Sequence, residues 1–211
     1  MNTDTSSQGL AERDNRLLGF LETALHYARV NSPESSIVCQ YASVEGSITK
    51  DIATQALFWL QKRFPLMQCS WPTFDKEDNP KHDFSFYDSL NSDADKISHI
   101  PLLLETQDKA EIDWQSLAKE EMTLKDFGKY LWRCRIVTNK DNSWSLIYFT
   151  THHSISDARS LIKVATTFLE YYADLEKDIK SKPSGFFEGK LFKAGDFLEK
   201  PKSEEAKTEQ P

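Results

Sequence analysis

The sequence predicts a layered α/β or α+β domain, in which helices pack on a sheet. Three observations support this fold class. Helical and strand-like patterns alternate along the chain, no internal repeat of solenoid length occurs, and aromatic residues make up 12% of the 211 residues. The alternation favours a layered domain over a helical bundle or a β-sandwich. The aromatic content indicates a packed core.

Composition excludes several classes of protein. Lys and Arg number 26 against 33 Asp and Glu, for a formal charge of -7, and no basic patch for nucleic acid stands out. Residues 1–15 lack the apolar segment of a signal peptide, and no stretch approaches the ~18 apolar residues of a membrane span. We therefore expect a cytoplasmic protein. Cys39, Cys69 and Cys134 form no CxxC pair and are expected to be buried, inert thiols.

The first half of the chain contains two predicted helices around one predicted strand. Residues 17–29 place apolar side chains on one helical face. Residues 36–44 are rich in β-branched residues and end at a turn, which predicts a strand. Residues 49–64 repeat apolar side chains every three or four positions, with Thr49 as a plausible N-cap and Pro65 ending the pattern.

Shorter patterns follow. Residues 66–71, 83–87 and 99–104 are apolar runs that we interpret as strands, although run length separates strand from helix poorly. Pro101 argues against a central position for the third run. Residues 111–121 predict a weaker helix.

The second half carries sharper patterns. Residues 130–138 and 144–153 are strand-like and are joined by a polar loop, which predicts an antiparallel hairpin. Residues 161–179 then trace one apolar face of a long helix. Both alternating faces of residues 144–153 are largely apolar, so this strand should be buried on both sides.

The chain divides into four predicted regions. Residues 1–14 are expected to be a flexible N-terminus, and residues 15–180 a single folded unit. Residues 181–198 read as an arm or linker with four Phe among glycines, and residues 199–211 as a charged, disordered tail.

The residues that could carry chemistry lie between the last strand and the long helix, at His152, His153 and Asp157. Neighbours on a strand point oppositely and cannot easily hold one metal, so no metal site is expected. One imidazole should pack inside while the other faces a cleft. Asp157 could cap the helix or pair with an arginine. From these residues alone, two ordinary core histidines and an N-cap remain the simpler interpretation.

Residues 130–137 and 146–158 resemble the HHxxxDG region of the chloramphenicol acetyltransferase-like acyltransferase superfamily, which includes condensation domains and alcohol acetyltransferases. Residues 63–67 resemble the family's "rhPlL" element. The likeness covers most of residues 15–180. It implies one chloramphenicol acetyltransferase-like lobe, similar to the N-terminal lobe of condensation domains, with a mixed, largely antiparallel sheet and helices packed on it.

The resemblance also implies an activity. Such proteins transfer an acyl group from a thioester, on coenzyme A or a carrier protein, to a hydroxyl or amine acceptor, with no bound cofactor. By this resemblance His153 is the general base, because an imidazole is partly neutral near neutral pH. His152 would orient it, and Asp157 would be structural and held by an arginine.

This sequence departs from the family pattern. Ala158 replaces the glycine of the motif, and Gln68 occupies the position of the arginine that pairs with the aspartate. We therefore expect Arg133 or Arg135 to replace that arginine, or Asp157 to cap the helix instead. Most relatives also have a second lobe, and no motif of that lobe is present here.

Two hypotheses follow. In the first, the chain is an acyltransferase whose site is completed by oligomerisation, as in a trimer, or by a partner lobe, and the aromatic arm docks on a neighbour. In the second, it is a non-catalytic binding or regulatory module that keeps the corner for folding. A serine hydrolase is disfavoured because the sequence has no GxSxG motif. The sequence leaves the acyl donor and the acceptor open.

Overall fold

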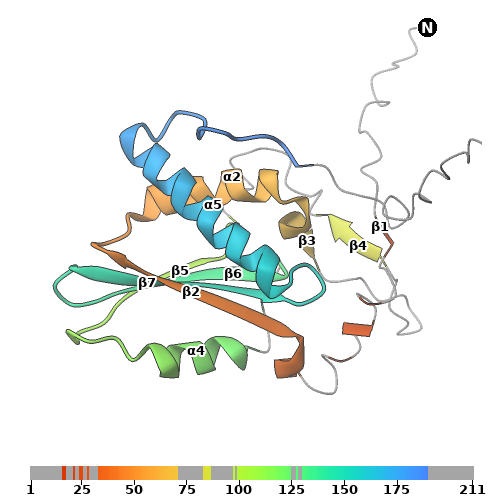
Figure 1. Cartoon of the computed structure of the whole chain (residues 1–211), viewed down its shortest axis with the longest axis horizontal. Coiled ribbons are helices and arrows are strands. Elements are labelled where there is room, and N and C mark those ends of the chain that lie inside the picture. Colours follow the sequence, from red (N-terminus) through yellow and green to blue (C-terminus); the bar gives the residue numbers. More distant parts are fainter. Residues whose placement is uncertain are drawn as a thin grey trace, which may run out of the picture.

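The computed structural model describes residues 16–17, 21, 24–25, 28, 33–70, 83–86, 97, 99–124, 127 and 130–189 (Figure 1). A four-stranded sheet with strand order β2-β7-β6-β5 forms the centre. Its strands are β2 (Ile37–Glu45), β5 (Leu102–Thr106), β6 (Trp132–Thr138) and β7 (Trp144–His152). β7 pairs antiparallel with both β2 and β6, whereas β5 pairs parallel with β6. The expected mixed, largely antiparallel sheet is confirmed.

Helices cover both faces of this sheet. Figure 1 shows α2 (Lys50–Arg63) and α5 (Ala158–Lys177) together on one face and α4 (Trp114–Met122) on the other. β7 is buried from Ser145 to His152, as the apolar character of both its faces predicts. The layered α/β fold class is therefore confirmed.

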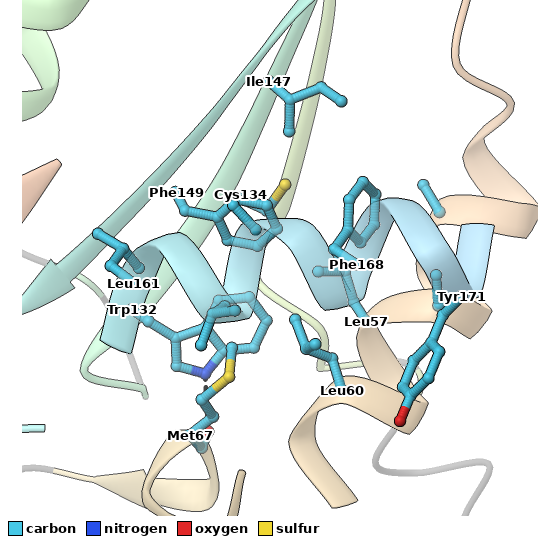
Figure 2. Close-up of a cluster of buried hydrophobic side chains, with 14 of the residues drawn as sticks. Leu57, Leu60, Met67, Trp132, Cys134, Ile147, Phe149, Leu161, Phe168 and Tyr171 are labelled. Atoms are coloured by element: carbon cyan, nitrogen blue, oxygen red, sulfur yellow. Dashed lines mark hydrogen bonds between the residues drawn. The ribbon is translucent and has the colours of Figure 1, made fainter. Parts of the chain in front are cut away.

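The main core lies between the sheet and the pair α2 and α5. Figure 2 shows how it is filled by side chains from both helices and from β6 and β7, among them Leu57, Leu60, Trp132, Phe149 and Phe168. The Trp132 indole Nε1–H donates a hydrogen bond to the Met67 carbonyl over 2.7 Å, so its one polar atom is satisfied in the core. This bond ties the chain after α2 to the sheet.

The strong sequence patterns correspond to observed elements. The predicted strand over residues 36–44 corresponds to β2, which follows a short 3-10 turn, η1 (Pro33–Ser36). The predicted helix over residues 49–64 corresponds to α2, and the predicted hairpin to β6 and β7. Thr49 occupies the N-cap position of α2 but makes no side-chain cap bond. Its backbone N–H instead donates to the Tyr172 hydroxyl over 2.9 Å, which joins the start of α2 to α5.

The prediction of a strand over residues 66–71 is wrong for most of its length. The chain forms a 3-10 turn, η2 (Pro65–Gln68), before the short strand β3 (Cys69–Ser70). Pro65 fixes its φ at the start of the turn, and the Met67 N–H closes it on the Phe64 carbonyl over 2.9 Å. β3 pairs with β4 (Asp83–Phe86), which confirms a strand near the predicted residues 83–87.

Element ends also differ from prediction. β5 begins only after Pro101, whose carbonyl accepts the Cys134 N–H, and it is an edge strand as the proline suggests. α4 begins at Trp114 because the Asp113 carboxylate accepts the Ser116 N–H over 3.1 Å. α5 begins at Ala158, three residues before the predicted start, and ends at Lys177.

The predicted helix over residues 17–29 is only partly described. Leu17 lies in β1 (Arg16–Leu17), which pairs with β4, so the helix does not begin there. Leu21, Ala24, Leu25 and Ala28 are helical. Leu21 is 68% exposed, which contradicts its expected place on a buried face.

Part of the predicted arm packs against α2 and α5 of the same chain. Phe186 packs against Trp59 and Tyr171, with ring centroids 4.8 and 6.2 Å away, and Gly189 donates its N–H to the Lys62 carbonyl. The expectation that this Phe docks on a neighbouring chain is therefore wrong. Phe192, Phe197, residues 1–14 and the predicted tail lie outside the described residues.

Two further expectations concern thiols and membranes. Cys69 and Cys134 are buried, Cys39 is half-buried, and none of the three takes part in a disulfide. Burial raises the pKa of Cys39 to about 11, which suppresses the reactive thiolate. Among the helices that the structure describes, none combines the length and apolar character needed to cross a bilayer.

Candidate functional site

The predicted site lies at the carboxyl end of β7, a strand with a neighbour on each side. β7 ends at His152, and α5 begins six residues later at Ala158. The His152 N–H donates to the Leu131 carbonyl and the His153 N–H to the Ser36 carbonyl, both over 2.7 Å. The two histidines are thus fixed by backbone bonds to opposite neighbours in the sheet.

His152 is the inward-facing histidine and is fully buried. Its Nδ1 accepts the backbone N–H of Ser154 over 3.1 Å and lies 2.6 Å from the Ser154 hydroxyl. Because a backbone N–H can only donate, Nδ1 carries no proton, and the neutral ring holds its proton on Nε2. Local bonds within the corner therefore fix the orientation and tautomer of His152, as expected for a packed, hydrogen-bonded imidazole.

His153 is half-buried, so its ring is partly accessible from outside the lobe. It follows the last residue of β7, and the backbone on both sides of it is held by hydrogen bonds. An imidazole on a rigid support can accept a proton from an approaching hydroxyl or amine. Of the two histidines, this one has the exposure that such chemistry requires.

Asp157 is the N-cap of α5 and is exposed. Its Oδ1 accepts the Ser160 N–H over 2.7 Å, and this bond is the main cause that lowers the pKa of Asp157, with a smaller contribution from attraction to His153. The expectation of an arginine partner is wrong, and the alternative of a helix cap is confirmed. Gln68 donates its amide to the Gln61 carbonyl instead.

Arg133 and Arg135 lie under α4 and meet carboxylates there, of which that of Glu121 is buried. Arg133 holds Glu121 through two nitrogens, its Nε lying 2.9 Å from Oε2. Arg135 bonds Glu105 and Glu120, each over 2.7 Å, and reaches Glu121 over 3.3 Å. Both arginines are therefore engaged in a charge cluster and do not orient the histidine corner.

Glu121 is the centre of this cluster and was not among the site residues predicted from the sequence. Its side chain is fully buried, and it also accepts the Thr150 hydroxyl over 2.6 Å. A signal was available: two arginines on one face of a strand with otherwise apolar neighbours require acidic partners. The neighbouring helix, α4, carries Glu120 and Glu121 in its last turn, and these supply them.

A pocket of about 800 Å³ lies at the other end of α5. It is lined by α2, the start of β5 and the chain after α5, including Lys50, Trp59, Leu102 and Lys180. His153 is not among its lining residues. Within the described part of the chain, no group of three or more His, Cys, Asp or Glu is placed to hold a metal ion.

Comparison with known proteins gives structural likeness alone. No family model matches the sequence, and no curated protein matches it. Solved structures do match. The first condensation domain of the calcium-dependent antibiotic synthetase, in complex with a substrate analogue, has a TM-score of 0.62 at 16% identity, over 83% of this chain and 42% of that one.

Two other structures extend this likeness. The starter condensation domain of rhizomide synthetase RzmA has a TM-score of 0.58 at 16% identity, over 81% of this chain and 40% of that one. The X-domain in complex with OxyB from teicoplanin biosynthesis has a TM-score of 0.58 at 11% identity, over 83% and 36%. The chain thus spans about two fifths of these proteins and has the fold of one condensation-domain lobe.

Proposed function

We propose that this chain is the histidine-bearing lobe of an acyltransferase. It would transfer an acyl group from a thioester, on coenzyme A or a carrier protein, to a hydroxyl or amine acceptor, with His153 as the general base. The observation that carries the proposal is the half-exposed His153 at the end of a central strand, in a chain with the fold of a condensation-domain lobe.

The corner supports this role by holding the backbone on both sides of the His153 ring. The His153 N–H is bonded to Ser36, and the preceding His152 is locked between the sheet and Ser154. Asp157, four residues on, is engaged as the cap of α5 and accepts the Ser160 N–H. Such a base contributes about 10²- to 10⁴-fold to the rate.

The proposed reaction has two steps, addition of the acceptor and loss of the thiol. The acceptor O–H or N–H gives its proton to His153 while its oxygen or nitrogen forms a bond to the thioester carbonyl carbon. The carbonyl electron pair then re-forms the double bond, the carbon–sulfur bond breaks, and the thiolate takes the proton back from the imidazolium. The products are an ester or amide and a free thiol, and His153 returns to its neutral form.

A second surface is needed to hold both substrates and exclude water. This chain spans about two fifths of the condensation-domain structures, so one lobe alone leaves the acceptor poorly positioned. A second lobe, from a homo-oligomer or another protein, would complete the site. The small-molecule donor and acceptor would then bind between the two lobes.

Thiol release tests the proposal directly. The full chain is incubated with acyl-coenzyme A or an acylated carrier protein and a panel of alcohols and amines, and a thiol-reactive dye follows release. We expect His153→Ala to lower the rate at least 100-fold. His99→Ala, which removes another half-buried histidine, should leave the rate unchanged. Equal rates for His153→Ala and the parent protein would refute the base assignment.

A non-catalytic binding module is the second candidate. Two observations favour it: Asp157 serves as the cap of α5, which is a structural role, and Gln68 stands where the family has the arginine that pairs with this aspartate. The X-domain, a protein with the same fold, forms a complex with OxyB. In that case the parent chain would release no thiol from any donor but would bind an acylated carrier protein in calorimetry, and His153→Ala would bind equally well.

A further inference from the structure

The outer edge of β2 has the features of a strand that pairs with another chain. β2 is the terminal strand of the four-stranded sheet, and Figure 1 shows it in front of β7, between α5 and α4. The bonds from His153 N–H to Ser36 O and from Gly46 N–H to Ser143 O show that even-numbered residues bond to β7. The odd-numbered residues therefore direct their N–H and C=O groups outward.

These outward groups are largely open. For Cys39, Tyr41 and Ser43, in the middle of β2, the described residues supply a single partner, the Gln40 side-chain amide on the Tyr41 carbonyl at 3.1 Å. β2 nevertheless has nine residues, more than an average strand. A row of unpaired backbone groups of this length is a template for a further strand.

β2 also lacks the features that normally protect an edge. It contains no Pro and no Lys, and its one charged residue, Glu45, is the last of the strand. Beside the edge, Tyr41 is 39% exposed and stacks on Trp114, which is 43% exposed, with ring centroids 5.2 Å apart. Exposed aromatic side chains next to open backbone groups indicate an interaction surface.

The sequence of β2 is compatible with its own antiparallel copy. If a twofold axis passes through Tyr41, Cys39 faces Ser43 of the second copy and Ile37 faces Glu45, and every outward backbone group finds a partner. The two Glu45 side chains then lie eight residues apart along the pair, about 27 Å, so no like charges meet. The exposed rings of Tyr41 from the two copies meet at the centre.

We infer that β2 pairs with β2 of a second copy to form a twofold dimer with one continuous eight-stranded sheet. His153 is next to Ser36, before the first residue of β2, so antiparallel pairing sends the two His153 corners to opposite ends of the sheet. The dimer leaves both corners open to a further lobe. The inference is independent of the proposed acyl transfer.

Two matched proline variants test the edge. Ser43→Pro removes an outward N–H of β2 and leaves the bonds to β7 intact. Thr106→Pro removes an outward N–H at the opposite edge of the sheet. In the parallel β5–β6 pair the odd-numbered residues bond to β6, so Thr106 directs its N–H outward. Both residues are exposed and carry a hydroxyl group.

Sedimentation equilibrium of the full chain over a range of concentrations should show a dimer. Ser43→Pro should raise the dimer dissociation constant at least tenfold, and Thr106→Pro should leave it unchanged, with circular dichroism confirming the fold of each. A parent chain that is monomeric or trimeric at every concentration overturns the inference. A Ser43→Pro variant that is folded and dimerises as tightly as the parent also overturns it.

Cross-linking tests the register. Tyr41→Cys places a thiol on the twofold axis, opposite its own copy, within the distance that a disulfide spans. Oxidation with copper phenanthroline should give a covalent dimer on a non-reducing gel. Leu103→Cys, at a β5 position 40% exposed, should stay monomeric on that gel. A covalent dimer from Leu103→Cys and none from Tyr41→Cys would overturn the inference.

Discussion

The sheet carries α2 and α5 on one face and α4 on the other, and different contacts hold the helices on the two faces. Against α2 and α5 the contacts are apolar: Leu57, Phe149 and Phe168 are almost wholly buried, and Phe149 and Phe168 meet edge to face. Against α4 the centre is charged, because buried Glu121 joins Arg133, Arg135 and Thr150.

Because of this difference, the two faces of the sheet tolerate different substitutions. An apolar core accepts small changes of shape at moderate cost, because its contacts are many and individually weak. A buried charge cluster depends on each partner, since removing one leaves the others uncompensated in a medium of low polarity. The α4 face should therefore be sensitive to a change of charge even where the shape is preserved.

Glu121→Gln should have the largest effect. It keeps the shape of the side chain but removes the charge that faces Arg133 and Arg135, so we expect a loss of about 3–5 kcal/mol in the free energy of unfolding. Urea unfolding followed by circular dichroism measures it. Glu120→Gln, whose parent side chain is 60% exposed, is the control and should cost less than about 1 kcal/mol. Equal costs for the two variants would contradict the difference between the faces.

Ile147→Val tests the apolar face with a conservative change. Ile147 is 1% exposed, and the substitution removes one methylene from the core that Figure 2 shows. We expect a loss of about 1 kcal/mol in the free energy of unfolding, measured in the same urea experiment. The loss should hardly vary with salt, because the substitution changes no charge. A loss above that of Glu121→Gln would reverse the order of the two faces.

Asp157→Ala should have the smallest effect and a distinct pH dependence. It removes the carboxylate that accepts the Ser160 N–H, at a cost of about 1 kcal/mol or less. The folded pKa of Asp157 is lowered from its ordinary 3.8, so its charge stabilises the protein above that pH. The contribution is lost as the pH falls through the lowered folded pKa.

Thermal unfolding from pH 7 to pH 2 measures this dependence. The difference between the parent chain and Asp157→Ala should shrink toward the acid end. Asp157→Asn, which keeps a capping oxygen without the charge, should stay close to the parent at pH 7. A difference that grows in acid would show that the carboxylate is not stabilising as an anion.

The sequence predicts most of the fold because the relevant signals are local. Periodicity defines α2 and α5, and alternation with a polar loop defines the β6–β7 hairpin. The predicted strand over residues 66–71 is mostly a turn, because an apolar run of that length fits a strand and a tight turn equally well. Pro65 at its start favours the turn. The proline ring fixes φ at Pro65, and this backbone constraint outweighs the strand-like apolar pattern.

The candidate site was predictable in part. The corner of His152 and Asp157 follows from strand alternation and capping, and the structure places a buried and a half-exposed histidine there. The partners of Arg133 and Arg135 were not predictable from spacing alone. Glu121 is near in sequence, but its burial depends on how α4 crosses the sheet, which is a tertiary feature.

The chain beyond α5 lies against the end of α2 at Gly189, where only a residue without a side chain fits. Gly189 lies so close to the end of α2 that an added Cβ would sit 2.0 Å from the Arg63 carbonyl oxygen, closer than a side-chain carbon can approach. Its N–H meanwhile satisfies a carbonyl of the last turn of α2. The missing side chain of Gly189 is therefore what allows the chain after α5 to lie against the end of α2. A shift of one residue that brought Glu188 to this place would drive its Cβ into the Arg63 carbonyl group.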